Sequence, residues 1–358
     1  MSAPTLPTTA ISTLLPILYA AKRTPIFVSR PGMAKTSMVR EGAKEIGTDV
    51  VVSELHLASM AEPDVRGYLI PQGEYADFTK PSFWRTVEKH PRGVLFLDEF
   101  TQCSHEMQKA VAPLLLERRI GDYTLPDGWM VAAAGNRLED NAGANALLSH
   151  VINRVAYIEC APPDVDEWVT WGVLAGLPHE LLAMAKLRPD VVFHSELPDG
   201  ADEPYCTPRS LHALGDIANA YRGGLLDMVD STVGRALITG CIGKGAAAEV
   251  IGMVKTTMRL PGFDTAMADP LNTVIPTAPD EAYAMAMLIA VRANSDKHRE
   301  SAAQYLTRFP INHALTGIVG LLRRDKGFLH SATFGAWVAN NRETVAKFQK
   351  FISLRETT

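Results

Sequence analysis

Over the first 160 residues, short apolar runs alternate with segments of helical periodicity. Five apolar runs have the length and the flanking residues of β-strands, and they cover residues 25–29, 50–57, 93–97, 129–134 and 155–159. Helical patterns lie between them at 36–46 and at 106–119, the second of which contains Pro113. Strands that alternate with helices predict a parallel sheet covered by helices on both faces.

The pattern changes after Ala161-Pro162-Pro163, and from there the periodicity is almost entirely helical. The clearest expected helices cover residues 164–177, 179–187, 208–221, 227–257 and 281–293. Residues 261–280 are rich in Pro, Gly and Asp, which predicts a linker or a long surface loop. The sequence thus predicts an α/β domain over residues 1–160, a helical domain over 161–260 and a helical C-terminal extension over 261–358.

Composition narrows the possible classes of protein. The 358 residues, 47% of them hydrophobic, can bury the cores of two or three domains. A formal net charge of -5 argues against a protein that coats nucleic acid by bulk positive charge. The four cysteines are far apart and show no zinc-site spacing, which fits reduced thiols in the cytoplasm. No signal peptide and no membrane span are expected, because no basic segment precedes an apolar core and no run of about 18 apolar residues is present.

A candidate phosphate-binding loop follows the first strand, with the sequence SRPGMAKT at residues 29–36. Backbone N–H groups in such a turn and at a helix N-terminus bind anions, a lysine there reaches the β/γ-phosphates, and a threonine hydroxyl can ligate Mg²⁺. The strict pattern G-x-x-x-x-G-K-[ST] has glycine where this chain has Ser29 and Ala34, although Gly32 is present. Alanine at position 34 is compatible with the loop if its φ is negative. The alternative is an ordinary strand–turn–helix with a surface lysine at Lys35.

Polar residues end two further predicted strands. Asp98 and Glu99 follow the run at 93–97, and Asn136 follows the run at 129–134. Because ligands gather at the carboxyl ends of parallel strands, Asp98 is expected to hold Mg²⁺ beside the loop, with Glu99 as general base for the attacking water. The Asn136 amide can orient that water. The alternatives are an acidic helix cap for the carboxylates and a turn asparagine for Asn136.

Two arginines complete the candidate set. Arg154 precedes the fifth strand and can enter a neighbouring subunit's site as an arginine finger, or serve only at a helix C-terminus. Arg209 lies in the first turn of an expected helix with Thr207 as N-cap and Pro208 at the first position. A positive charge there is unfavourable for the helix dipole, which suggests that Arg209 reaches a phosphate from a lid domain.

With these residues assembled, the chain resembles the MoxR-like group of AAA+ ATPases, close to the dynein-related AAA_5 type, over roughly residues 10–225. The family's phosphate loop often reads G-x-P-G-x-A-K-[ST], so Ala34 fits this branch, whereas Ser29 departs from it. The resemblance implies a P-loop NTPase with a five-stranded parallel sheet, and it makes Asp98 and Glu99 Walker B, Asn136 sensor 1, Arg154 the arginine finger and Arg209 sensor 2. It also implies contacts to ATP and Mg²⁺ from the loop, whose residues are Pro31, Gly32, Met33, Ala34, Lys35, Thr36 and Ser37.

The resemblance further implies a ring, usually a hexamer, that remodels or chaperones a protein partner, with a von Willebrand A-domain protein as a possible partner. Family insertions correspond to residues 58–78 and 121–128, whose Tyr68, Tyr75 and Tyr123 are expected either in pore-facing loops or in packed hairpins without substrate contact.

Two other functions are compatible with the sequence. One is a motor or loader acting on nucleic acid, with Lys22, Arg23, Arg118 and Arg119 along a track, although the acidic balance makes nucleic acid a less expected partner. The other is a non-catalytic scaffold stabilised by nucleotide, suggested only by Ser29 and Ala34. No membrane partner is expected. The glycine-rich segment 240–245 does not follow a strand, and we interpret it as a helix break or a close helix contact.

Overall fold

The computed structural model describes residues 5–140, 143–194 and 203–342. The chain divides into two compact units, which we call the α/β unit, up to Pro163, and the helical unit, from Asp164 onward. The boundary falls in the proline-rich segment where the sequence pattern changes. The further division of the helical part at residue 260 stays a prediction.

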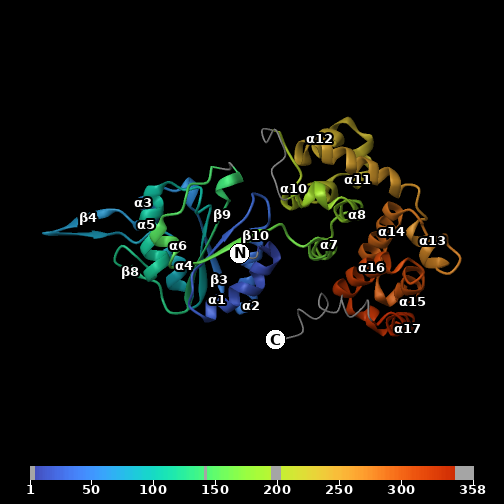
Figure 1. The fold of residues 1–358 in the computed structure, drawn as a ribbon, viewed down its shortest axis with the longest axis horizontal. Helices are drawn as coiled ribbons and strands as arrows, with labels where there is room; N and C mark the ends of the chain where they lie inside the picture. The colour runs from blue at the N-terminus through green and yellow to red at the C-terminus, as the bar shows by residue number, and fades with distance from the viewer. Residues whose placement is uncertain (1–4, 141–142, 195–202, 343–358) are drawn as a thin grey trace. The chain divides into compact units, whose positions relative to one another are not determined.

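The α/β unit is built on a six-stranded parallel sheet (Figure 1). The strands, in spatial order, are β1 (Leu6–Pro7), β10 (Ala156–Ala161), β2 (Pro25–Val28), β9 (Trp129–Gly135), β6 (Gly93–Asp98) and β3 (Val51–His56). All five strands expected from the sequence are confirmed, as is the parallel P-loop type of fold. The two-residue β1, which pairs with β10 at the edge, is too short for a periodicity to reveal. Because every pair is parallel, the carboxyl ends of all strands meet at one edge of the sheet.

Successive side chains of the central strands enter two different cores, as the period of two in a strand requires. Ile26 and Val28 pack in the core that contains α5 (His105–Glu117), whereas Phe27 packs in the core that contains α1 (Ile11–Ala20) and α2 (Lys35–Ile46). Both faces of the sheet are therefore covered at its centre, where β2, β9 and β6 are buried on both sides. The remaining helical segments of this unit are η1 (Thr8–Ala10), η2 (Leu57–Ser59), α3 (Glu62–Arg66), α4 (Trp84–Lys89), η3 (Leu138–Asp140) and α6 (Ser149–Ile152).

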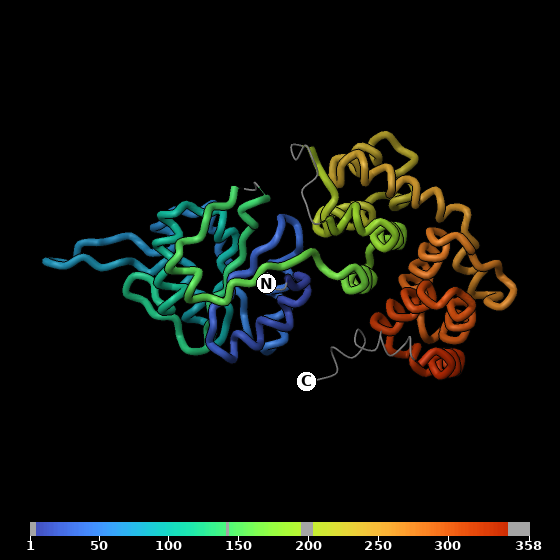
Figure 2. The backbone as a smooth tube through the Cα atoms, viewed as in Figure 1, coloured from blue at the N-terminus to red at the C-terminus, as the bar shows by residue number. Residues whose placement is uncertain are grey.

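Two antiparallel hairpins interrupt the α/β pattern. One joins β4 (Leu69–Gln72) to β5 (Tyr75–Phe78) and projects from the body of the unit (Figures 1 and 2). The other joins β7 (Arg119–Ile120) to β8 (Tyr123–Thr124). The insertion expected at residues 58–78 contains the first hairpin, whereas the insertion expected at 121–128 contains only β8 of the second.

The helical unit contains helices and 3₁₀ turns throughout its described residues. They are α7 (Val165–Leu174), α8 (His179–Leu187), α9 (Pro189–Val192), α10 (Pro208–Ala220), α11 (Gly224–Asp230), α12 (Thr232–Thr257), α13 (Phe263–Ala268), α14 (Pro279–Arg292), α15 (Ser295–Leu306), α16 (Ile311–Arg324), η4 (Lys326–His330) and α17 (Ala332–Asn340). One apolar core joins side chains of α7, α8, α10, α12 and α14, and a second joins α13 to α17.

Two expectations for the helical unit were wrong. The single helix expected at 227–257 is interrupted at Ser231, which ends α11 and acts as an N-cap of α12, with its hydroxyl accepting a hydrogen bond from Gly234 N. The loop expected at 261–280 contains α13, whose Phe263, Ala266 and Met267 enter the second core. In both places tertiary burial and local capping outweigh composition.

The glycine-rich segment 240–245 lies inside α12 and breaks it, as expected. Gly243 has φ 77 and ψ 167, and a Cβ there would lie 2.0 Å from the carbonyl oxygen of Pro204. Only glycine fits both the conformation and the close approach. Among the described residues α12 is also the one helix long and apolar enough by composition to cross a membrane, which the sequence had not indicated, and 44% of its apolar window is buried inside the protein.

The four cysteines are free thiols. Burial raises the pKa of Cys103 and of Cys160 to about 11, and that of Cys206 to about 12. These three thiols are therefore protonated at neutral pH and chemically inert, as structural cysteines are.

Candidate functional site

The loop between β2 and α2 has the backbone shape of an anion cradle. Gly32 has φ 76, and Ala34 has φ 62 and ψ 20, so two residues of the turn are left-handed. α2 begins at Lys35 without a side-chain cap and without an acidic residue in its first turn. Its first amides and the positive end of its dipole therefore face the loop, which suits a bound phosphate.

The left-handed Ala34 corrects one expectation, because a negative φ was the condition under which alanine fits this position. The loop imposes the left-handed conformation on a residue with a Cβ, which costs about 1–2 kcal/mol. Glycine relieves this strain but loses more entropy on folding, by roughly 0.5–1 kcal/mol.

We expect Ala34→Gly to leave the free energy of unfolding unchanged or raise it by up to about 1 kcal/mol, measured by urea denaturation. Ala21→Gly is the matched control, because Ala21 has φ -76 and the substitution there should lower stability by roughly 0.5–1 kcal/mol. Equal destabilisation by both substitutions would show that the loop does not strain Ala34.

Lys35 lies inside the loop rather than on the surface, with 8% of the residue exposed. Its Nζ donates to the backbone oxygens of Ser29 at 3.2 Å and of Arg30 at 3.1 Å, to Ser29 Oγ at 3.0 Å and to Asn136 Oδ1 at 3.1 Å. The reading of Lys35 as an ordinary surface lysine is therefore wrong. Ser29, at a position where the family pattern has glycine, contributes a hydroxyl to the lysine's surroundings.

The expected magnesium ligands lie side by side. Thr36 Oγ1 donates to Asp98 Oδ2 at 2.7 Å, and Asp98 Oδ1 accepts from Glu99 N at 2.9 Å. Glu99 follows the last residue of β6 and has φ 58. Such a conformation is uncommon for a residue with a side chain and is concentrated at functional sites.

Asn136 is fixed by a residue that the sequence did not single out. Thr101 Oγ1 accepts from Asn136 N at 2.7 Å and lies 2.9 Å from Asn136 O, to which it donates. A Cβ at Gly135 would lie 2.3 Å from Thr101 Oγ1, so the Gly-Asn pair at the end of β9 leaves space for this hydroxyl. Their distance in the sequence gave no sign of this contact. The two residues meet because Thr101 follows β6, Asn136 follows β9, and these strands are neighbours in the sheet.

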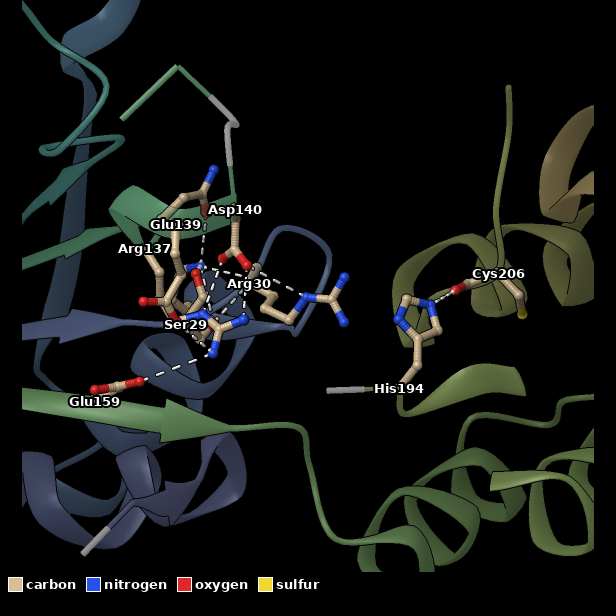
Figure 3. A network of polar contacts seen from close by, with 10 residues as sticks. Ser29, Arg30, Arg137, Glu139, Asp140, Glu159, His194 and Cys206 are labelled. Atoms are coloured by element: carbon tan, nitrogen blue, oxygen red, sulfur yellow. Dashed lines mark hydrogen bonds and ion pairs between the residues drawn. The ribbon is translucent and has the colours of Figure 1, made fainter. Parts of the chain in front are cut away.

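A second group missed by the sequence lies beside the loop (Figure 3). The Asp140 carboxylate accepts from Arg137 Nε at 3.1 Å and Nη2 at 2.7 Å, and it lies 3.6 Å from Arg30 Nε. The hydrogen bond to Asp140 raises the pKa of Arg137. Arg137 also contacts Glu139 at 3.1 Å and Glu159 at 3.9 Å. Oppositely charged residues three positions apart, such as Arg137 and Asp140, are common in turns, so their spacing alone did not indicate a site.

The two arginines expected to act on phosphate are exposed. Arg154 follows α6, and Arg209 lies in the first turn of α10 in the helical unit. The predicted cap is confirmed, because Thr207 Oγ1 accepts from Ser210 N and Pro208 opens the helix. Of the other loop residues, Met33 is buried, Ser37 is exposed, and Pro31 and Gly32 are partly exposed. The catalytic roles of Arg154 and Arg209 stay predictions.

The insertion tyrosines differ in exposure. Tyr68 is 63% exposed and Tyr75 is 77% exposed, both on or next to the β4–β5 hairpin. Tyr123 instead packs against Trp84 and donates its hydroxyl to Phe78 O at 2.5 Å. Tyr123 therefore has the packed role that was the alternative for all three.

One residue of the suggested nucleic-acid track, Arg118, binds backbone carbonyl oxygens of its own unit. Arg118 has φ 59 at the end of α5, and its Nη2 donates to Pro126 O at 2.5 Å and to Trp129 O at 2.9 Å. Lys22, Arg23 and Arg119 are exposed. The track suggested from sequence therefore loses one of its four cations.

The residues at this edge of the sheet fit a magnesium nucleotide. Hydroxyl and carboxylate oxygens from Thr36 and Asp98 are the donors that Mg²⁺ prefers, and Mg²⁺ on nucleotides typically takes one or two protein ligands beside the phosphates. No group of three or more His, Cys, Asp or Glu residues forms a metal site within residues 5–140, 143–194 and 203–342. Lys35 and the uncapped start of α2 supply the charge and the amides for phosphate.

Residues 26–154 match the family model of the AAA domain, dynein-related subfamily. The α/β unit is therefore similar to an AAA domain over this segment, which is about a third of the chain. The matched segment contains the phosphate loop, Asp98, Glu99, Asn136 and Arg154, so all candidate residues except Arg209 lie within the matched residues.

Solved structures resemble the chain more distantly. The RuvB Holliday junction branch migration motor of Thermotoga maritima is 16% identical, with 73% of this chain and 75% of that chain covered and a TM-score of 0.36. NtrX from Brucella abortus is 11% identical, with 87% and 59% covered and a TM-score of 0.34. Likeness at this level carries no argument about function. No curated protein sequence matches the chain.

Proposed function

We propose that this chain is an AAA+ ATPase of the MoxR-like kind, which assembles into a ring and couples ATP hydrolysis to the remodelling of a protein partner. The observation that carries the proposal is the convergence of Lys35, Thr36, Asp98 and Asn136 at the carboxyl edge of the sheet, with Lys35 3.1 Å from Asn136 and Thr36 2.7 Å from Asp98. These residues come from α2, from β6 and from the position directly after β9, and only the fold brings them together.

Each candidate residue of the α/β unit has a proposed role in ATP hydrolysis. ATP with Mg²⁺ supplies the triphosphate and the divalent cation when bound. Lys35 and the first amides of α2 bind the phosphates, and Thr36 and Asp98 hold the metal. Glu99 accepts the proton of the attacking water, while the Asn136 amide orients that water.

Two arginines are proposed to complete the site. Arg154 of a neighbouring subunit and Arg209 of the helical unit stabilise the charge that develops on the transferred phosphate. Their exposure and the ring assembly implied by the family resemblance support this assignment.

The β4–β5 hairpin favours a protein partner. Tyr68, Leu69, Ile70 and Tyr75 are 63, 58, 42 and 77% exposed, which makes the hairpin an apolar surface. Exposed apolar groups gathered on one projecting element are typical of protein contacts, whereas nucleic-acid tracks gather Lys and Arg.

The partner class is tested by the rate of phosphate release from ATP with an unfolded polypeptide, such as casein, or with DNA added. We expect the polypeptide to raise the rate of the wild type but not of Tyr75→Ala, whose basal rate stays normal. Tyr157→Ala, which removes a 47% exposed tyrosine from β10, is the matched control and should respond like the wild type. DNA binding at about 50 mM salt, combined with stimulation by DNA alone, would instead indicate a nucleic-acid motor.

A further inference from the structure

Two links join the phosphate loop to the end of β9. The first runs through Lys35, whose Nζ lies 3.1 Å from both Arg30 O and Asn136 Oδ1. The second runs through Asp140, which lies in the 3₁₀ turn that follows Asn136. Its Oδ1 is 3.6 Å from Arg30 Nε. The two links connect the same two segments, so the position of Arg30 determines where Lys35 lies relative to Asn136.

The surroundings of Asp140 favour a fixed contact with Arg30. Its side chain is 3% exposed and that of Arg30 is 2% exposed, so water screens their attraction little. The bidentate contact with Arg137, at 3.1 and 2.7 Å, fixes the plane of the carboxylate. Arg137 has Glu139 and Glu159 as further partners, and these carboxylates hold the guanidinium that contacts Asp140 from its solvent side. One carboxylate oxygen is thereby presented to Arg30 in a set direction (Figure 3).

We propose that Asp140 is a positioning residue for ATP hydrolysis, which fixes the phosphate loop to the end of β9 through Arg30 and so keeps Lys35 and Asn136 in register. The inference rests on the proposed ATPase function. Asp140 touches neither nucleotide nor water in this role. It acts through the backbone of Arg30, whose carbonyl helps to place the lysine, and through the 3₁₀ turn that follows Asn136.

The role predicts effects on catalysis that a purely structural residue would not have. Asp140→Asn keeps the size of the side chain and removes its charge, so the loop can shift relative to Asn136. Small displacements of catalytic groups can cost about 10²-fold in rate, and we expect kcat to fall at least about tenfold, with ATP bound several-fold more weakly. The control is Glu139→Gln, which removes a carboxylate from the same Arg137 at a 70% exposed position and should stay within about twofold of the wild type.

The experiment measures kcat from phosphate release at saturating ATP, and Kd from titration with a fluorescent ATP analogue, well below the midpoint of thermal unfolding of each variant. Arg30→Gln removes the other end of the link, and should reproduce the loss even if Asp140→Asn fails to fold. The double variant should be no worse than the more affected single variant, since both remove one interaction.

The outcomes separate the inference from the proposed function. Loss in Arg30→Gln, and also in Asp140→Asn if that variant folds, with normal Glu139→Gln, supports the inference. Wild-type kcat and Kd in Arg30→Gln, or in a folded Asp140→Asn, overturn it and leave the ATPase assignment intact. A wild type that neither binds nor hydrolyses ATP overturns the proposed function, and the inference with it.

Discussion

Glu99→Gln is expected to abolish ATP turnover while ATP stays bound. Glutamine has the shape of glutamate but cannot accept a proton, and general-base catalysis contributes about 10²–10⁴-fold to such reactions. The contacts proposed to hold the nucleotide come from Lys35, Thr36 and Asp98, which the substitution does not touch. Phosphate release measures turnover, and nucleotide retained after gel filtration measures binding.

Glu117→Gln is the matched control for this prediction. Glu117 is exposed in the last turn of α5, outside the candidate site, so its substitution should change neither quantity. If Glu99→Gln hydrolysed ATP at the wild-type rate, Glu99 would not be the base. If it lost ATP altogether, the left-handed Glu99 would be needed to shape the loop rather than to activate water.

Arg154→Ala is expected to lower ATP hydrolysis by about 10³–10⁵-fold without loss of nucleotide binding, the range known for arginine fingers. The reason is that Arg154 is exposed and is proposed to serve the site of a neighbouring subunit. Arg119→Ala removes another exposed arginine, from β7, and should leave hydrolysis unchanged.

Mixing two inactive variants tests whether the site is shared. In a mixed ring, a Glu99→Gln subunit supplies an intact Arg154 to the site of an Arg154→Ala subunit, which still has Glu99. Activity should therefore reappear in the mixture, although neither variant alone is active. An inactive mixture whose subunits are shown to co-assemble would place Arg154 in its own subunit's site.

The sequence predicted the sheet and the polar residues at its carboxyl edge, because local patterns indicate both. Apolar runs bounded by Pro, Gly and charged residues mark the five main strands, and the polar residues that end them must meet at one edge of a parallel sheet. The order of those residues then suggested what the edge binds. Helix ends were predicted well where a capping residue was present, as at Thr207 and Pro208.

The remaining features depend on tertiary structure. The left-handed φ of Ala34 is imposed by the loop that surrounds Lys35, and alanine itself favours the opposite sign. The pairing of Asp140 with Arg30 joins residues 110 positions apart, and no periodicity connects them. Ser231 divides an otherwise continuous apolar pattern, because its side chain competes for the backbone of the next turn.

A crystal structure of the Glu99→Gln variant with ATP and Mg²⁺ tests the central claim most directly. The account predicts the triphosphate on the first amides of α2, with Lys35 Nζ moved from Ser29 and Asn136 to the phosphate oxygens and Mg²⁺ on Thr36 and Asp98. Nucleotide bound elsewhere on the chain, or Lys35 still on its present partners with the nucleotide in place, would contradict it.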